Sequence, residues 1–293
     1  MFLEERLTLN IADVAIGIDW DRRSDSLSSG GSYRDFLCRD EPEVAVTVHH
    51  GIPRFLPGPG DLVFDSQSHW KLFRNMGSTI VTLESPVPTP RRYCMAVFDD
   101  EFRHGDVYLS DSGYETGPNG SAPQSIDHTL MQILAVCLMS RGRGLMIHAC
   151  GVDHEGRGYL FAGNSGHGKS TMAALWTDSG LILNDDRIVL GRSGDSFRIF
   201  GTPWHGTFPA ALRRSVRLDK VFFLRHSGTN VAKPVTGASA CSMLLARSFP
   251  PLWDREGMSF TLDLLSALVE EVRFYELGFL PSHEAVDFVL SLE

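Results

Sequence analysis

The sequence of 293 residues predicts an α/β fold of the mixed α+β kind, in which a β-rich N-terminal domain precedes a core built on a mixed sheet. Three observations support this prediction. Residues 1–112 hold many short apolar runs separated by turn-forming residues. A stretch rich in Gly and Pro, residues 113–124, then interrupts the chain. Beyond it, strand-like and helix-like runs alternate around a glycine-rich segment.

The first domain, residues 1–120, is expected to consist of short strands joined by tight turns. One hairpin is predicted to close around Asn75-Met76-Gly77 and a second to turn through Asp99–Gly105. The expected strands are Val14–Ile18, Val44–Val48, Leu62–Phe64, Trp70–Phe73, Thr79–Leu83, Tyr93–Phe98 and Val107–Leu109.

The second domain, residues 121–293, is expected to mix helices and strands. Ser125 is a plausible N-cap for a helix over Ile126–Met139. The runs Leu145–Val152 and Tyr159–Ala162 flank a turn at residues 154–158, so they predict an antiparallel hairpin. Further strands are expected at Leu181–Asp186, Arg198–Phe200 and Lys220–Leu224, and an amphipathic helix from about Ser282 closes the chain.

Composition and charge restrict the class of protein. Hydrophobic residues make up 43% and charged residues 22%, which is typical of a globular domain. A net charge of −9 argues against a nucleic-acid partner. Five widely spaced cysteines without a C-x-x-C pair predict a reducing compartment, with neither disulfides nor a zinc site. No signal peptide and no membrane-spanning run is recognisable, so we expect a cytoplasmic protein without a membrane partner.

The glycine-rich segment Gly163–Ser170 fits the phosphate-binding pattern G-x-x-x-x-G-K-[ST]. A strand-like run precedes it and a helix-forming run, Thr171–Trp176, follows, as such a loop requires. In this pattern the lysine reaches the β/γ-phosphates and the serine hydroxyl binds Mg²⁺. The sequence therefore predicts that ATP or another nucleoside triphosphate binds with Mg²⁺. The expected contacts are Gly163, Asn164, Ser165, Gly166, His167, Gly168, Lys169, Ser170 and Thr171.

Two adjacent carboxylates, Asp185 and Asp186, end the next apolar strand. Phosphoryl transfer needs a carboxylate that holds Mg²⁺, and often a second that orients or deprotonates the nucleophile. Because adjacent strand residues point to opposite sides, one of the pair is expected to face the phosphates and the other a substrate or the interior. The residues alone leave open which aspartate is the base and which serves the metal.

Three further features are candidates for the same site. His148 lies on the hairpin arm beside the loop strand, where it is either a hydrogen-bonded core residue or a partner of the γ-phosphate or of the second aspartate. The segment Gly201–Gly206 is either a substrate wall or a tight turn with a packed Trp. A run of cations follows, which clamps phosphate or forms a solvated helix face; we expect one member to touch nucleotide or substrate. Its members are Arg213, Arg214, Arg217, Lys220 and Arg225.

Taken together, the hairpin, the loop and the aspartate pair resemble the HPr kinase/phosphorylase family, whose nucleotide-binding core is similar to that of phosphoenolpyruvate carboxykinase. The resemblance implies an HPr-kinase-like P-loop core with a mixed sheet. It further implies that Asp186 takes the proton from a serine hydroxyl and that Asp185 and Ser170 serve Mg²⁺. By the same resemblance His148 supports the catalytic aspartate or the γ-phosphate, beside the phosphate-binding Lys169.

The segments Gly201–Gly206 and Phe274–Leu277 resemble the diverged HPr-kinase-like proteins of bacterial peptide-modification clusters, some of which phosphorylate a precursor peptide. This implies an ATP-dependent kinase that phosphorylates a serine or other hydroxyl, with a peptide or small protein as acceptor. Because the family often forms homo-oligomers, a homo-oligomer is a candidate assembly. Two alternatives remain open. One is a small-metabolite kinase, for which a parallel sheet around the loop is expected; the other is a nucleotide-binding sensor or scaffold without turnover.

Overall fold

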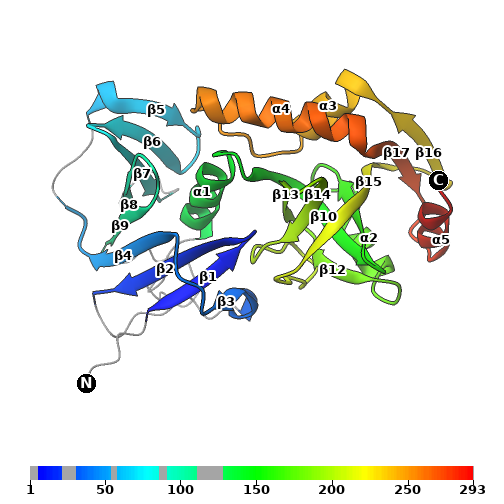
Figure 1. The fold of residues 1–293 in the computed structure, drawn as a ribbon, viewed down its shortest axis with the longest axis horizontal. Helices are drawn as coiled ribbons and strands as arrows, with labels where there is room; N and C mark the ends of the chain where they lie inside the picture. Colours follow the sequence, from blue (N-terminus) through cyan, green and yellow to red (C-terminus); the bar gives the residue numbers. More distant parts are fainter. Residues whose placement is uncertain (1–5, 22–30, 54–57, 86–90, 111–127, 293) are drawn as a thin grey trace. The chain divides into compact units, whose positions relative to one another are not determined.

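The fold, seen in a computed structural model, is α+β: it contains two mixed sheets together with helices (Figure 1). The structure describes residues 6–21, 31–53, 58–85, 91–110 and 128–292. The chain divides into two compact units, Met1–Ala135 and Val136–Glu293. The domain boundary expected at residues 120 and 121 lies outside the described residues, as does the expected N-cap Ser125.

The first unit holds a nine-stranded sheet in the order β3-β1-β2-β4-β9-β8-β7-β6-β5. Strands β2, β4 and β9 run parallel to one another, and the other neighbours are antiparallel. All seven expected strands are confirmed, whereas β1 and β3 were not predicted. The elements are β1 (Leu7–Ile11), β2 (Val14–Trp20), the 3₁₀ turn Gly31–Phe36, β3 (Leu37–Cys38), β4 (Val44–His50), the 3₁₀ turn Pro59–Asp61, β5 (Leu62–Asp65), β6 (Trp70–Asn75), β7 (Ser78–Glu84), β8 (Arg92–Asp99) and β9 (His104–Leu109).

Both predicted hairpins of this unit are confirmed, and local turn chemistry explains them. In the first, Asn75 pairs with Ser78, and Met76 and Gly77 adopt φ values of 47° and 77°, the left-handed pair typical of a two-residue hairpin turn. In the second, the Asp99 carboxylate accepts hydrogen bonds from the backbone N–H groups of Arg103 and His104, which fixes the turn between β8 and β9.

The second unit holds an eight-stranded sheet in the order β11-β10-β13-β14-β15-β17-β16, with β12 paired to β10. An additional pairing of β11 with β15 closes five of these strands into a ring. The expected hairpin is confirmed as the antiparallel pair β10–β11. The strands are β10 (Gly144–His154), β11 (Arg157–Ala162), β12 (Leu181–Asn184), β13 (Arg187–Ser193), β14 (Ser196–Gly201), β15 (Ser215–His226), β16 (Val231–Val235) and β17 (Arg273–Phe279).

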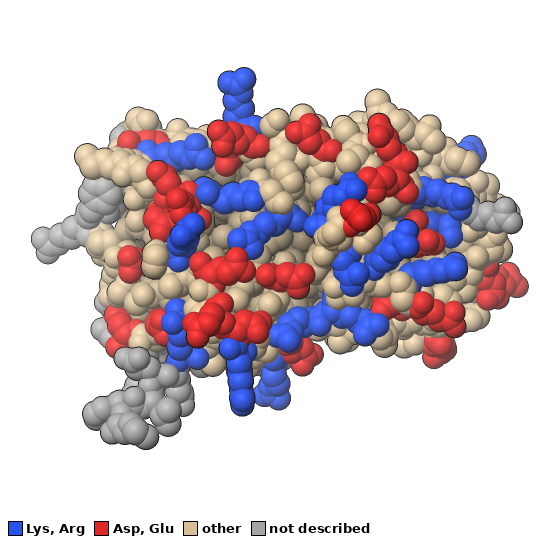
Figure 2. All heavy atoms as spheres, viewed as in Figure 1, with Lys and Arg blue, Asp and Glu red and all other residues tan. Residues whose placement is uncertain are grey.

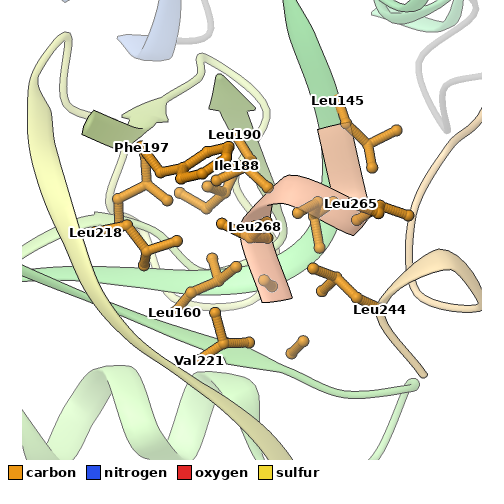
Figure 3. Close-up of a cluster of buried hydrophobic side chains, with 14 of the residues drawn as sticks. Leu145, Leu160, Ile188, Leu190, Phe197, Leu218, Val221, Leu244, Leu265 and Leu268 are labelled. Atoms are coloured by element: carbon orange, nitrogen blue, oxygen red, sulfur yellow. The ribbon is translucent and has the colours of Figure 1, made fainter. Parts of the chain in front are cut away.

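Alternating side chains of these strands feed two apolar clusters on opposite faces of the sheet. On β11, Leu160 belongs to one cluster and Phe161 to the other. The first cluster also takes Leu244 and Leu268 from helices α3 and α4, and Figure 3 shows these side chains converging with those of the strands. The second cluster packs against α2 and α5. The helices are α1 (His128–Met139), α2 (Lys169–Leu175), α3 (Gly237–Leu245), α4 (Arg255–Glu271) and α5 (Glu284–Ser291).

Helix boundaries and surface charge follow simple rules. The Asp254 side chain caps α4 by accepting hydrogen bonds from the N–H groups of Glu256 and Gly257.

None of the helices in the described ranges has the length and apolar character that crossing a membrane requires. Basic and acidic side chains are interspersed on the face that Figure 2 shows, so no field of a single sign covers that face.

Candidate active site

The phosphate loop joins the end of β11 to the start of α2. Gly166 and Gly168 adopt φ values of 83° and 91°, a left-handed conformation that glycine tolerates and that turns the loop toward the helix N-terminus. The His167 ring nitrogen Nδ1 lies 3.0 Å from the carbonyl oxygen of Leu224, so this side chain anchors the loop to β15. The helix N-terminus therefore faces the loop with its backbone N–H groups, the arrangement that binds anions.

Lys169 lies at the base of the loop and is only 7% exposed. Its Nζ donates hydrogen bonds to the carbonyl oxygens of Gly163 at 2.9 Å and Asn164 at 3.1 Å. Burial lowers the pKa of Lys169 and outweighs the opposing charges of Asp186 and Asp185. The ammonium group is thus held within the loop by polar contacts that an incoming phosphate can replace.

Asp185 is a buried carboxylate directly beside Ser170. The Ser170 Oγ donates a 2.7 Å hydrogen bond to Asp185 Oδ2. The backbone N–H groups of Gly206 and Phe208 donate to the same carboxylate at 2.6 and 2.9 Å. With 1% exposure and three donors, Asp185 is fixed in orientation. One of its donors comes from the Gly201–Gly206 segment, which therefore contributes to the site through its backbone.

The two aspartates do not lie on a strand, contrary to expectation. Strand β12 ends at Asn184, and Asp185 and Asp186 form the turn that leads into β13. The Asn184 Oδ1 accepts hydrogen bonds from the N–H groups of Asp186 and Arg187, and its Nδ2 donates to the carbonyl oxygen of Thr202. Both carboxylates line one cavity, in which Asp185 lies beside Ser170 and Asp186 lies beside His148.

Asp186 is paired with two cationic or proton-donating groups. Its Oδ1 lies 2.8 Å from His148 Nε2, and its Oδ2 accepts a 2.5 Å hydrogen bond from Arg187 Nη1. Burial by itself raises the pKa of Asp186, but the His148 hydrogen bond and the Arg187 charge outweigh burial, so the pKa is lowered. Asp186 is therefore an ionised, oriented carboxylate at neutral pH.

These groups surround a cavity of about 300 Å³. The predicted loop residues Gly163, Asn164 and His167 are not part of its lining, and they form the base of the loop instead. The lining comprises His148, Ser165, Gly166, Gly168, Lys169, Ser170, Thr171, Asp185, Asp186, Gly206 and Thr207.

The cation run expected to supply a phosphate clamp is placed differently. It belongs largely to strand β15, not to a helix face, and none of its members lines this cavity. Arg225 pairs with Glu276, and Arg214 pairs with Asp153. Arg217 and Lys220 line a second cavity at the start of the strand.

Sequence reasoning missed Arg187 and the turn-forming role of Asn184. The Arg187 guanidinium lies 4.3 Å from the ring centroid of Phe249, so one residue both stacks on an aromatic ring and binds Asp186. The backbone N–H of His148, on β10, donates a hydrogen bond to the carbonyl oxygen of Arg247. This bond ties the segment that carries Arg247 and Phe249 to β10. No local sequence pattern predicts these contacts. An Asn directly before two aspartates is, however, a turn signal from which the turn after β12 could have been predicted.

The donor set fits a magnesium nucleotide. Mg²⁺ is usually held by one or two carboxylates, with phosphates and waters completing its shell, and not by an all-protein cage. The Ser170 hydroxyl and the Asp185 carboxylate provide oxygen ligands for such a metal beside the loop. Within the described ranges no group of three or more His, Cys, Asp or Glu side chains forms a metal cage. The site therefore suits a metal that arrives with a phosphate ligand.

No protein-family model matches the chain, and no curated protein sequence matches it. Among solved structures, that of the HPr(Ser) kinase/phosphatase from Coxiella burnetii is similar at 12% sequence identity and a TM-score of 0.30. The match covers 50% of this chain and 92% of that chain. A TM-score of this size supports no functional argument, so the functional argument below depends on the geometry of the site.

Proposed function

We propose that this protein is a phosphotransferase of the HPr-kinase-like type, which transfers the γ-phosphoryl group of ATP or another nucleoside triphosphate to a hydroxyl group. One observation carries the proposal. A phosphate loop, a Ser170–Asp185 pair at 2.7 Å and a separate Asp186–His148 pair at 2.8 Å meet around one cavity. Nucleotide binding alone needs the first two elements, whereas phosphoryl transfer also needs a group for the acceptor.

The residues divide the work as follows. Backbone N–H groups of the loop and the Lys169 ammonium bind the phosphates and stabilise negative charge. Ser170 and Asp185 hold the metal, and Mg²⁺ when bound supplies charge neutralisation at the phosphates. Asp186 accepts a hydrogen bond from the acceptor hydroxyl, orients it toward the γ-phosphate and takes its proton. His148 and Arg187 keep the Asp186 carboxylate in place.

A lowered pKa at Asp186 is compatible with this role. Phosphoryl transfer proceeds through a loose transition state in which little proton transfer precedes bond cleavage. Orientation of the hydroxyl therefore matters more than the strength of the base. An ionised carboxylate held by two partners supplies that orientation.

A serine on a peptide or small protein is our proposed acceptor. Figure 2 and the net charge of −9 give no support to a nucleic-acid acceptor. The small-metabolite alternative expects a parallel sheet around the loop. The sheet around the loop is instead mixed: β11 pairs antiparallel with β10 and parallel with β15, which supports the HPr-kinase-like arrangement. A sensor without turnover has no chemical need for Asp186 held by both His148 and Arg187.

The test is phosphoryl transfer from γ-labelled ATP with Mg²⁺ to peptides encoded by neighbouring genes. We expect label on a peptide serine, and we expect Asp186→Asn to lower the rate by roughly 10² to 10⁴ while nucleotide affinity stays unchanged. Asp195→Asn is the matched control, because Asp195 is exposed and lies in the turn between β13 and β14. ATP binding without transfer to any peptide or small hydroxyl compound would refute the proposed kinase activity. A nucleotide sensor without turnover would then be the remaining alternative.

A further inference from the structure

A second cavity, of about 480 Å³, lies at the other end of the strands that carry the phosphate loop. Strand β11 begins at Arg157 beside this cavity and runs away from it into Gly163. The neighbouring parallel strands β15 and β17 also present their amino-terminal halves to it. The last residues of α5 and the residue that follows the helix, together Leu290–Leu292, line it as well. The cavity is therefore separate from the site described above.

Four cations line this cavity: Arg157, Arg217, Lys220 and Arg273. Arg157 lies opposite Arg217 in the β11–β15 register, and Lys220 lies opposite Arg273 in the β15–β17 register. Like charges directly opposite each other on neighbouring strands destabilise a sheet. Two such pairs gather positive charge at one end of the sheet, and a bound anion would offset their repulsion.

The protein itself neutralises this charge only in part. Asp219 is the one carboxylate among the lining residues, and it binds Lys220 Nζ at 3.0 Å. Within the described ranges, Arg157, Arg217 and Arg273 form no ion pair with a carboxylate. Three exposed guanidinium groups thus line the cavity without a carboxylate partner among the described residues.

The cavity is also preorganised around a buried ring. Lys220 is 5% exposed, and its Nζ lies 5.7 Å from the ring centroid of Tyr159. Tyr159 is itself 1% exposed and stacks on Trp176 and Phe222. One of the four cations, Lys220, is therefore buried beside a fixed aromatic side chain, whereas the three arginines are exposed.

We infer that this cavity, defined by Arg157, Arg217, Lys220 and Arg273, binds a small molecule that carries phosphate groups. Guanidinium groups match phosphate oxygens in planar, two-point hydrogen bonds. A volume of about 480 Å³ suits a small-molecule ligand. A nucleic acid is disfavoured by the net charge of −9. The inference does not depend on the kinase activity proposed above.

The test is calorimetric titration of the full chain with inorganic pyrophosphate in the absence of Mg²⁺. Four proteins are compared: the unmodified chain, Lys169→Ala, Arg217→Ala/Arg273→Ala, and the charge-matched control Lys233→Ala/Arg255→Ala. The control residues are exposed and lie outside this cavity. We expect the Arg217→Ala/Arg273→Ala protein to lose roughly tenfold or more in affinity per arginine. The other two variants retain binding at this cavity.

Three outcomes would overturn the inference. Loss of all binding in Lys169→Ala alone would assign pyrophosphate to the phosphate loop. Equal losses in the two double variants would indicate unspecific attraction to charge, and no binding to the unmodified chain would exclude the ligand class. Arg217→Gln/Arg273→Gln, which keeps side-chain volume, must repeat the loss with an unchanged thermal unfolding midpoint. Each of these outcomes can be interpreted even if the protein fails to phosphorylate a peptide, because the titration measures binding and not turnover.

Discussion

The Ser170 hydroxyl donates a 2.7 Å hydrogen bond to the carboxylate of Asp185, and this contact joins the phosphate loop to the turn after β12. Its oxygen keeps its acceptor lone pairs, and both residues line the same cavity. A serine with its proton committed to a carboxylate is oriented to accept a cation. The contact therefore explains why the loop serine and the first aspartate act as one unit.

Ser170→Ala is expected to weaken the contribution of Mg²⁺ to nucleotide binding. The substitution removes the proposed metal ligand and one of three donors to Asp185, so affinity for the nucleotide with Mg²⁺ should fall roughly tenfold. Affinity measured in excess chelator should stay the same. Calorimetric titration with and without Mg²⁺ checks this prediction.

Ser193→Ala, which removes an exposed hydroxyl on β13, is the matched control and should change neither affinity. Equal losses with and without Mg²⁺ in Ser170→Ala would mean that the loop had been distorted, and the assignment of this serine to the metal would then fail.

Asp186 makes stability depend on pH in a defined direction. Although burial raises its pKa, the His148 hydrogen bond and the Arg187 charge lower it below the ordinary aspartate value. The ionised carboxylate therefore stabilises the fold above that ordinary value, near pH 4. This contribution is lost as the pH falls through the lowered, folded-state pKa.

Urea unfolding of the parent and of Asp186→Asn, in steps from about pH 7 to about pH 3, measures this contribution. We expect the difference in free energy of unfolding between the two proteins to shrink toward the acid end. Asp195→Asn, at an exposed turn, should show no such trend. A difference that stays constant or grows on acidification would contradict the predicted ionisation.

Asn184 is predicted to be the main structural support of the site. Its side chain is 0% exposed and makes three hydrogen bonds with backbone groups. Asn184→Ala leaves those groups unpaired, so the free energy of unfolding should fall by about 3 kcal/mol. Asn230→Ala removes a single exposed hydrogen bond to Leu280 and should cost below about 1 kcal/mol. Urea unfolding of both variants measures these changes in the free energy of unfolding. Similar decreases in Asn184→Ala and Asn230→Ala would refute the structural role of Asn184.

Local signals account for the parts of the fold that the sequence predicted. Strands such as Val44–His50 alternate buried and less buried side chains, and turns such as Met76-Gly77 carry their own backbone preference. The phosphate-loop pattern could be predicted for the same reason, since it consists of eight consecutive residues. Helix α4 has a local signal too, its N-cap Asp254, which was not used.

The contacts that complete the site could not be predicted because they are long-range. Arg187 meets Phe249 and Asp185 meets the backbone of Gly206 only after β13, β14 and the segment before α4 have packed. The position of Arg217 could not be predicted for the same reason. A run of cations looks alike on a helix or a strand, and only the β11–β15 pairing places Arg217 and Lys220 at the end of the sheet away from the phosphate loop.

Gly168→Ala should impair the phosphate loop more than a glycine substitution of equal backbone strain elsewhere. Gly168 has a φ of 91°, and an added Cβ would lie 2.9 Å from the Phe279 ring, which is buried against α5. The N-terminus of α2 must then shift, and its N–H groups no longer converge on a phosphate. We expect nucleotide affinity to fall at least about tenfold, measured by calorimetric titration.

Gly142→Ala separates backbone strain from this steric conflict. Gly142 has a φ of 84°, and an added Cβ meets no atom within 4 Å. Both variants carry the left-handed cost of about 1–2 kcal/mol, which urea unfolding records. Because only Gly168 adjoins the cavity, Gly142→Ala should retain full nucleotide affinity. Undiminished affinity in Gly168→Ala would show that the close approach of Phe279 does not fix the loop, and the anion-binding role of the α2 N-terminus would lose its support.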